Sequence, residues 1–321
     1  MKRFLKGLLG VLLSLAALAI LAGWFFSSRD YSGYFQEQRG KLSAVTVEAA
    51  GGDSLFQKSW VTLRSTSGLR VLSGMLVPSR APGVGGRGIP AARYPAVIVL
   101  GGKATGKYAV DYALDIENVI IAAPDYPYEP RASYTTFEVL AEVPAIRRAI
   151  IDMMPSVMLL MDYLHTRKDV DTARIVLLGY SFGAPFVPCI VANDRRAAVA
   201  AMVYGGGDVG SLIGHNIARY KGPFLGNIGG WLAGILLHPV EPLRYVGSVS
   251  PIPLLMINGT EDEQVPRPNA ELLFAGAREP KRIVWIESQH VHPRNVELTR
   301  QIVTTLKHEL AAMKIVPESP R

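Results

Sequence analysis

The sequence predicts an α/β fold with a mostly parallel eight-stranded sheet, helices on both of its faces, and a separate membrane-anchor helix at the N-terminus. Three observations lead to this prediction. Hydrophobic residues make up 49% of the 321 positions and charged residues only 19%, which is typical of a globular chain with a large core. Short, uniformly apolar runs alternate with stretches of helical periodicity. A long charge-free segment precedes them.

That N-terminal segment has no charged residue over positions 7–28 and follows Lys2, Arg3 and Lys6. At about 1.5 Å per residue it is long enough for a hydrocarbon core of roughly 30 Å. We therefore expect residues 1–28 to form a single-pass anchor that contacts the membrane through residues 7–26. The N-terminus would be cytoplasmic, and the rest would lie on the outer, periplasmic or extracellular, side. The alternative is a signal peptide cleaved near residues 17–19, which would give a secreted protein.

Charge and cysteine content exclude several function classes. Three of the basic residues behind the net charge of +7 lie in the first six positions, and the remainder shows no basic and aromatic clustering of the kind that binds nucleic acid. Cys189 is the single cysteine, so neither an internal disulfide nor a cysteine-based metal cluster is possible. We expect no nucleic-acid partner, and the sequence leaves the oligomeric state undetermined.

A linker is expected over 29–41, followed by one domain over 42–315. Its sheet opens with antiparallel strands, because β-rich runs at 44–48, 60–64 and 70–77 are separated by turn residues. A loop rich in Pro, Gly and Arg follows at 78–94. Strands that are apolar throughout, as in a parallel sheet, are then expected at 96–100, 119–123, 174–178, 199–204, 253–258 and 282–287. A helix over 143–166 precedes the third of these, and Pro155 should kink or split it.

The connection between the strands at 199–204 and 253–258 is much longer than an ordinary βα loop. We expect it to hold a cap inserted at about 209–245. Within it, residues 223–237 have no charge and include Trp231. This stretch is short for a membrane span. Two interpretations remain open, namely an apolar lid helix over a site and a buried crossover helix.

The segment Gly179-Tyr180-Ser181-Phe182-Gly183 directly follows a predicted strand and precedes an apolar helix. This is the context of a nucleophile elbow, a sharp turn that exposes a serine and leaves no room for side chains at its two glycines. We therefore predict Ser181 as a nucleophile. A serine hydroxyl needs a base to accept its proton and an acid to orient that base.

Both partners follow at the ends of later strands. The acid is expected in Glu261-Asp262-Glu263 and the base at His290, which gives the chain order Ser, acid, His. We favour Asp262 as the acid, with Asp208 as an outside candidate, and we favour His290 over His292 as the base. The oxyanion hole is predicted to use the backbone N–H groups of Phe182 and Gly102.

Several further segments resemble the α/β-hydrolase superfamily, in particular its dienelactone-hydrolase-like and acetyl-esterase-like branches. Besides the elbow, they are residues 169–175, Ala123-Pro124-Asp125-Tyr126-Pro127 and residues 259–266. The resemblance covers roughly residues 58–312. It implies the same roles for Ser181, Asp262, His290, Gly102 and Phe182. Two departures stand out: Leu100-Gly101 replaces a common His-Gly pair, and a serine replaces the cysteine of dienelactone hydrolases, which points to ordinary esters.

The sequence thus predicts a serine hydrolase that cleaves a small-molecule carboxylic ester through an acyl-enzyme, with no metal or organic cofactor. Two alternatives remain. The same triad could serve an acyltransferase or thioesterase, or the domain could be a non-catalytic binding module on a hydrolase fold.

Overall fold

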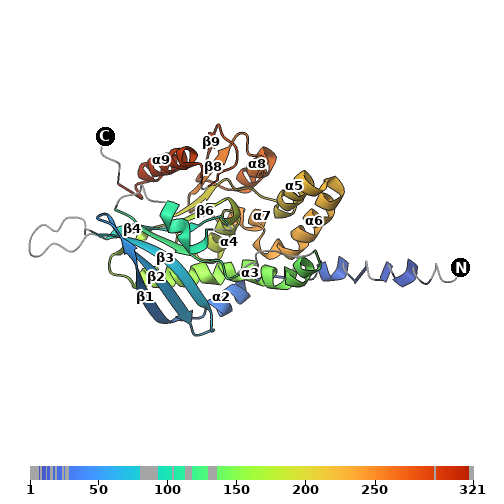
Figure 1. Cartoon of the computed structure of the whole chain (residues 1–321), viewed down its shortest axis with the longest axis horizontal. Helices are drawn as coiled ribbons and strands as arrows, with labels where there is room; N and C mark the ends of the chain where they lie inside the picture. The colour runs from blue at the N-terminus through green and yellow to red at the C-terminus, as the bar shows by residue number, and fades with distance from the viewer. Residues whose placement is uncertain are drawn as a thin grey trace, which may run out of the picture.

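The computed structural model describes residues 29–79, 93–102, 105–112, 118–128, 136–292 and 294–317, together with scattered helical residues between 7 and 25. Nine strands of this part of the chain form one sheet in the order β1-β2-β3-β5-β4-β6-β7-β8-β9 (Figure 1). Their bounds are β1 Leu42–Gly52, β2 Phe56–Ser65, β3 Arg70–Pro78, β4 Tyr94–Leu100, β5 Ile120–Pro124, β6 Val170–Tyr180, β7 Val199–Val203, β8 Leu254–Gly259 and β9 Lys281–Ile286.

The sheet is larger than predicted. All three early β-rich runs enter it, each pairing antiparallel with its neighbour, and β3 pairs antiparallel with β5. From β5 onward the pairs are parallel. The predicted count of eight is therefore wrong by one, because β1 pairs with β2 along most of its length and adds an edge strand. The mostly parallel sheet with helices is confirmed.

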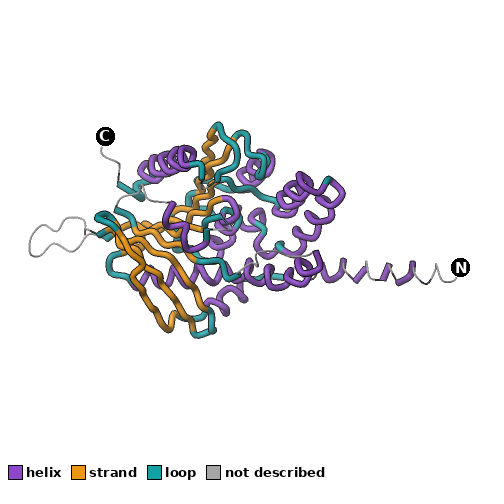
Figure 2. The backbone as a smooth tube through the Cα atoms, viewed as in Figure 1, coloured by secondary structure: helices purple, strands orange, loops and turns teal. Residues whose placement is uncertain are grey.

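Alternate residues of the central strands enter two separate cores, which explains why these strands are apolar throughout. Ile98 and Leu100 pack with α3 (Thr136–Thr166) and α4 (Phe186–Asn193). Val97 and Val99 pack on the opposite face with η1 (Gly106–Tyr112) and α9 (Val296–Ala312). Figure 2 shows helices on both faces of the sheet.

Helix α3 continues through Pro155, so the predicted split does not occur. The turns on either side of the proline are held by tertiary burial, since Met154 and Val157 are fully buried. This packing compensates for the hydrogen bond that the proline cannot donate.

The predicted linker over 29–41 is part of the domain instead of a free spacer. It contains helix α2 (Ser32–Arg39), in which Phe35 is fully buried. Nearby, the Tyr34 hydroxyl donates to Asp152 Oδ1 of α3 at 2.6 Å, and Arg147 Nη2 donates to the Tyr31 hydroxyl at 2.8 Å. Aromatic side chains thus attach this segment to α3.

The anchor expected over 1–28, with membrane contact through 7–26, lies partly outside the described residues, which here include only scattered helical positions between 7 and 25. Among the residues that are described, no helix has both the length and the apolar character needed to cross a bilayer.

Between β7 and β8 the chain forms a set of helices. They are α5 (Val209–Lys221), α6 (Pro223–Leu236), η3 (His238–Val240), α7 (Pro242–Tyr245) and η4 (Val246–Ser248). Helices α8 (Arg267–Gly276) and η2 (Ser181–Gly183) complete the elements.

Helices α5 and α6 form a hairpin whose backbones approach closely at glycines. A Cβ at Gly210 would lie 2.9 Å from the carbonyl oxygen of Gly230, and one at Gly214 would lie 2.9 Å from that of Gly226. Only glycine fits at such a contact. The glycine-bearing side of α6 is therefore fixed against α5, and its other side faces away from α5.

Candidate active site

Ser181 occupies a strained position at the turn between β6 and α4. Its φ angle is 50°, in the left-handed region that a serine rarely adopts. The flanking residues must be glycines because a side chain would not fit at either position. A Cβ at Gly183 would lie 2.1 Å from the carbonyl oxygen of Leu100 in β4, and one at Gly179 would lie 2.5 Å from that of Gly183. The turn therefore presents the hydroxyl on a fixed backbone.

Replacing Gly183 with alanine should lower the free energy of unfolding by about 1–3 kcal/mol, because the backbone of β4 or of the turn must move to admit the methyl group. The same shift should displace Ser181 and reduce ester hydrolysis at least tenfold. Thermal melting and steady-state kinetics measure the two effects. The matched control is Gly33→Ala in α2, where a Cβ meets nothing within 4 Å. Equal melting temperatures for the parent and Gly183→Ala would contradict the prediction.

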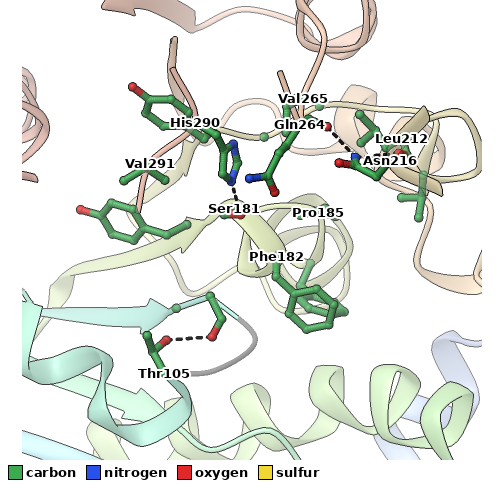
Figure 3. Close-up of a pocket in the computed structure, with 18 of the residues that line it drawn as sticks. Thr105, Ser181, Phe182, Pro185, Leu212, Asn216, Gln264, Val265, His290 and Val291 are labelled. Carbon is green, nitrogen blue, oxygen red and sulfur yellow. Dashed lines mark hydrogen bonds between the residues drawn. The ribbon is translucent and has the colours of Figure 1, made fainter. Parts of the chain in front are cut away.

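Ser181, His290 and Asp262 form a chain of hydrogen bonds. Ser181 Oγ lies 2.7 Å from His290 Nε2 (Figure 3), and His290 Nδ1 lies 2.9 and 2.8 Å from the two carboxylate oxygens of Asp262. Asp262 Oδ1 also accepts the backbone N–H groups of Gln264 and Val265 at 2.8 and 2.9 Å. The side chain of Asp262 is 1% exposed, so its carboxylate is held in one orientation.

The competing candidates have other contacts. His292 Nδ1 accepts the backbone N–H of Arg294 at 3.2 Å, although its residue contributes to the wall of the same cavity. Asp208 caps α5 by accepting from Ser211 N. The Glu263 carboxylate accepts the backbone N–H of His290 at 3.2 Å. Burial opposes ionisation of Glu263, but backbone hydrogen bonds outweigh it and lower the pKa of this carboxyl.

Tyr204 supports His290 and was not identified from the sequence. The two rings meet edge to face, with centroids 5.6 Å apart and an interplanar angle of 88°. Tyr204 is fully buried at a φ of 56°, and its hydroxyl is hydrogen-bonded to Ser288. A tyrosine at the end of an apolar strand gives no sequence signal for this role.

Gly102 and Phe182 border the same cavity as Ser181. The hydroxyl of Tyr126 donates to the carbonyl oxygen of Gly101. Because the C=O and N–H of a trans peptide point in opposite directions, the N–H of Gly102 points away from Tyr126. Thr105 fixes the next peptide by donating its N–H and hydroxyl to the carbonyl oxygen of Gly102 at 2.9 and 2.8 Å. Side chains therefore fix the orientation of both peptides in this loop.

Ser181 opens into a cavity of about 990 Å³. Its walls are mostly apolar and come from the ends of the strands, from α4 and from α5. Helix α5 contributes Val209, Leu212, Ile213, Asn216, Ile217, Tyr220 and Lys221. A volume at the top of the usual range for ligand sites, with few polar groups, suits a molecule with a substantial apolar part.

The helix that covers the cavity is α5 and not α6, so neither a lid helix nor a buried crossover helix describes residues 223–236. Leu237, the last residue of the predicted stretch, does border the cavity. Helix α6 contributes no residue to the wall, and Trp231 is 54% exposed on its outer side. The reason is the glycine contact, which puts α6 behind α5. Helix α5 itself is bonded to the loop of the acid (Figure 3), since Asn216 Nδ2 donates to the carbonyl oxygen of Gln264 at 2.8 Å. His215 Nε2 also lies 3.0 Å from the carbonyl oxygen of Glu263.

No protein-family model matches the chain. Over 127 residues it is 32% identical to the uncharacterized protein YfhR of Escherichia coli K12, a match that covers 39% of this chain and 41% of YfhR. The chain thus spans less than half the length of this relative.

Solved structures match over far more of the chain. Acetyl xylan esterase 1 from Thermoanaerobacterium sp. JW/SL YS485 superimposes with a TM-score of 0.61 at 13% identity, covering 87% of this chain and 94% of the esterase. The α/β hydrolase GrgF from Penicillium sp. sh18 gives 0.50 at 17% identity, covering 79% of this chain and 99% of GrgF. Together with the mostly parallel sheet and the strand–turn–helix at Ser181, these likenesses show that the chain has the α/β-hydrolase fold.

Proposed function

We propose that the protein is a serine hydrolase that cleaves carboxylic esters through an acyl-enzyme on Ser181. The observation that carries this proposal is the chain of hydrogen bonds from Ser181 through His290 to Asp262, at the wall of an apolar cavity. Esterases among the structures of like fold support hydrolysis at a general level.

In this proposal Ser181 Oγ attacks the ester carbonyl carbon while His290 Nε2 accepts the hydroxyl proton. Asp262 accepts the Nδ1–H of the imidazole and stabilises the imidazolium that forms. His290 then gives the proton to the alkoxide as it leaves. Water repeats the sequence on the acyl-enzyme, with His290 first taking a proton from the water and then returning it to Ser181.

The negative charge on the carbonyl oxygen of the substrate requires two aligned N–H donors. We assign this role to the backbone of Phe182, which follows the nucleophile, and to that of Gly102. Tyr126 is a positioning residue in this scheme, because its hydroxyl fixes the peptide that carries the N–H of Gly102.

A fluorophosphonate probe tests the proposed function directly, because such probes form a covalent bond with an activated serine. The parent protein should gain one adduct, located by mass spectrometry on the peptide that contains Ser181. Ser181→Ala should gain none, and His290→Ala should react far more slowly. A parent protein that stays unlabelled at high probe concentration would rule out an activated Ser181.

The cavity predicts a preference for esters with a hydrophobic acyl or alcohol group. Across p-nitrophenyl esters of two to twelve acyl carbons, kcat/KM should rise with chain length. Ile213→Trp, which adds bulk to the cavity wall, should lower kcat/KM for long esters at least tenfold and leave the acetate little changed. The matched control is Ile228→Trp on α6, outside the wall. If the parent, Ile213→Trp and Ile228→Trp all gave the same dependence of kcat/KM on chain length, the cavity would not select the substrate.

We also infer that residues 1–28 anchor the protein in a membrane through residues 7–26, with the N-terminus cytoplasmic and the hydrolase domain on the outer side. The charge-free length and the preceding Lys2, Arg3 and Lys6 support this inference. The protein should stay with membranes through alkaline and high-salt extraction, because apolar burial does not depend on charge. A mature N-terminus near Ile20, found by mass spectrometry, would instead indicate a cleaved signal peptide.

A further inference from the structure

Helix α6 exposes a row of large apolar side chains on the side that faces away from α5. The row follows helical spacing, so its members share one face. We call it the α6 outer face: Phe224, Leu225, Ile228, Trp231 and Leu232, which are 74%, 49%, 43%, 54% and 42% exposed. A contiguous exposed apolar patch of this kind marks a contact surface.

The domain itself cannot cover this patch. The opposite side of α6 includes Gly226 and Gly230, whose close approach to the backbone of α5 leaves no space for rotation of the helix. Figure 1 shows the α5–α6 hairpin at one end of the molecule. The α6 outer face is therefore turned toward the surroundings at that end.

The predicted anchor lies against the same helix. Gly23 is buried, and a Cβ there would lie 3.2 Å from Ile235 Cδ1. Ile235 continues the row of the α6 outer face, one turn beyond Trp231 and Leu232. The described residues of the N-terminal segment also emerge from the molecule at the α5–α6 end (Figure 1). The apolar surface of α6 thus continues into the charge-free segment.

The hairpin itself carries only basic charge. Residues 209–240 include no Asp or Glu, and their two charged residues are Arg219 and Lys221. Asp208 and Glu241 flank this stretch, and Arg219 Nη2 lies 3.9 Å from Glu263 Oε1. Arg219 and Lys221 are both exposed at the end of α5, on either side of Tyr220, which is 77% exposed. Basic and aromatic side chains beside an apolar helix face are typical of helices that lie in the interface of a bilayer.

We propose that the α6 outer face inserts into the lipid interface of the membrane that holds residues 7–28. In this arrangement α6 lies along the membrane surface as a second point of attachment. The anchor alone would attach the domain to the membrane at a single point. The two contacts together hold α5, and with it the wall of the cavity, next to the bilayer.

The test uses the full chain in phosphatidylcholine vesicles that contain phosphatidylglycerol. A nitrobenzoxadiazole fluorophore is attached at Leu225→Cys or, as the matched control, at Leu272→Cys on α8. Both leucines are 49% exposed. The native Cys189 does not compete for the label, because it is fully buried and burial raises the pKa of its thiol to about 12.

The label at Leu225→Cys should shift to shorter wavelength and lose at least half of its intensity when the vesicles contain nitroxide-labelled lipids. The label at Leu272→Cys should keep its spectrum. Equal, weak quenching at both positions would overturn the proposal. The proposal would also be overturned if the fluorescence at Leu225→Cys were not quenched by nitroxide lipids but changed on dilution with unlabelled protein. That result would identify a second copy of the chain as the occupant of the α6 outer face. None of these results depends on enzymatic activity.

Discussion

Ser181→Ala is expected to reduce kcat/KM for ester hydrolysis by about four to six orders of magnitude, because no acyl-enzyme can form without the hydroxyl. Fold stability should change little. The left-handed backbone at Ser181 strains an alanine about as much as a serine, and the glycines at 179 and 183 still provide the space that the turn needs. Steady-state kinetics on p-nitrophenyl esters and thermal melting measure the two quantities.

The matched control is Ser211→Ala, an exposed serine on α5, which should keep the activity of the parent. Turnover in Ser181→Ala within tenfold of the parent would remove Ser181 as the nucleophile. A large fall in melting temperature would instead show that the hydroxyl has a structural role.

His290→Ala is expected to reduce kcat/KM by about three to five orders of magnitude, since no other group in the hydrogen-bond chain can accept the serine proton. His292→Ala should cost less than tenfold, because the His292 ring bonds to the backbone of Arg294 and not to Ser181. Asp262→Asn should fall between the two, since it disturbs the tautomer and orientation of His290 but leaves the base in place. All three are compared with the same esters.

The ranking of these variants decides the assignment. A severe loss in His292→Ala together with a mild loss in His290→Ala would transfer the role of base to His292. Comparable, mild losses in all three would leave the hydrogen-bond chain without a catalytic role.

The site was largely predictable from the sequence, because its parts lie where simple rules put them. The elbow is a local feature, with glycines at 179 and 183 that leave space for a sharp turn. Asp262 and His290 follow neighbouring parallel strands, whose carboxyl ends meet at one edge of the sheet. The sequence favoured His290 over His292 without excluding either, because two residues of spacing in a loop do not define a direction. In the structure His290 is the one hydrogen-bonded to Ser181.

Other features depend on contacts between distant segments. All nine strand segments were predicted, but the sheet was counted as eight-stranded and the attachment of α2 was missed, because each depends on a partner elsewhere in the chain, for example Phe35 on α3. One of the two open interpretations placed a lid helix in the more apolar segment, residues 223–237, yet the cavity faces α5, which includes Asn216. Tyr126 lies in a segment that the resemblance includes, but the positioning role proposed for it depends on the plane of a single peptide bond.

In the proposed hydrolase, the hydrogen bonds from α5 to residues 263 and 264 would couple entry of the substrate to the catalytic chemistry. If α5 moves outward to admit a substrate, the bonds of Asn216 and His215 to that loop must break. The same loop supplies the two N–H groups that hold the Asp262 carboxylate. An open cap would therefore leave the acid less well oriented, and the triad would be fully assembled only after α5 has closed over the substrate. Closure and activation would then be a single thermodynamic event, in which free energy gained from contacts with the acyl chain also orders the catalytic base.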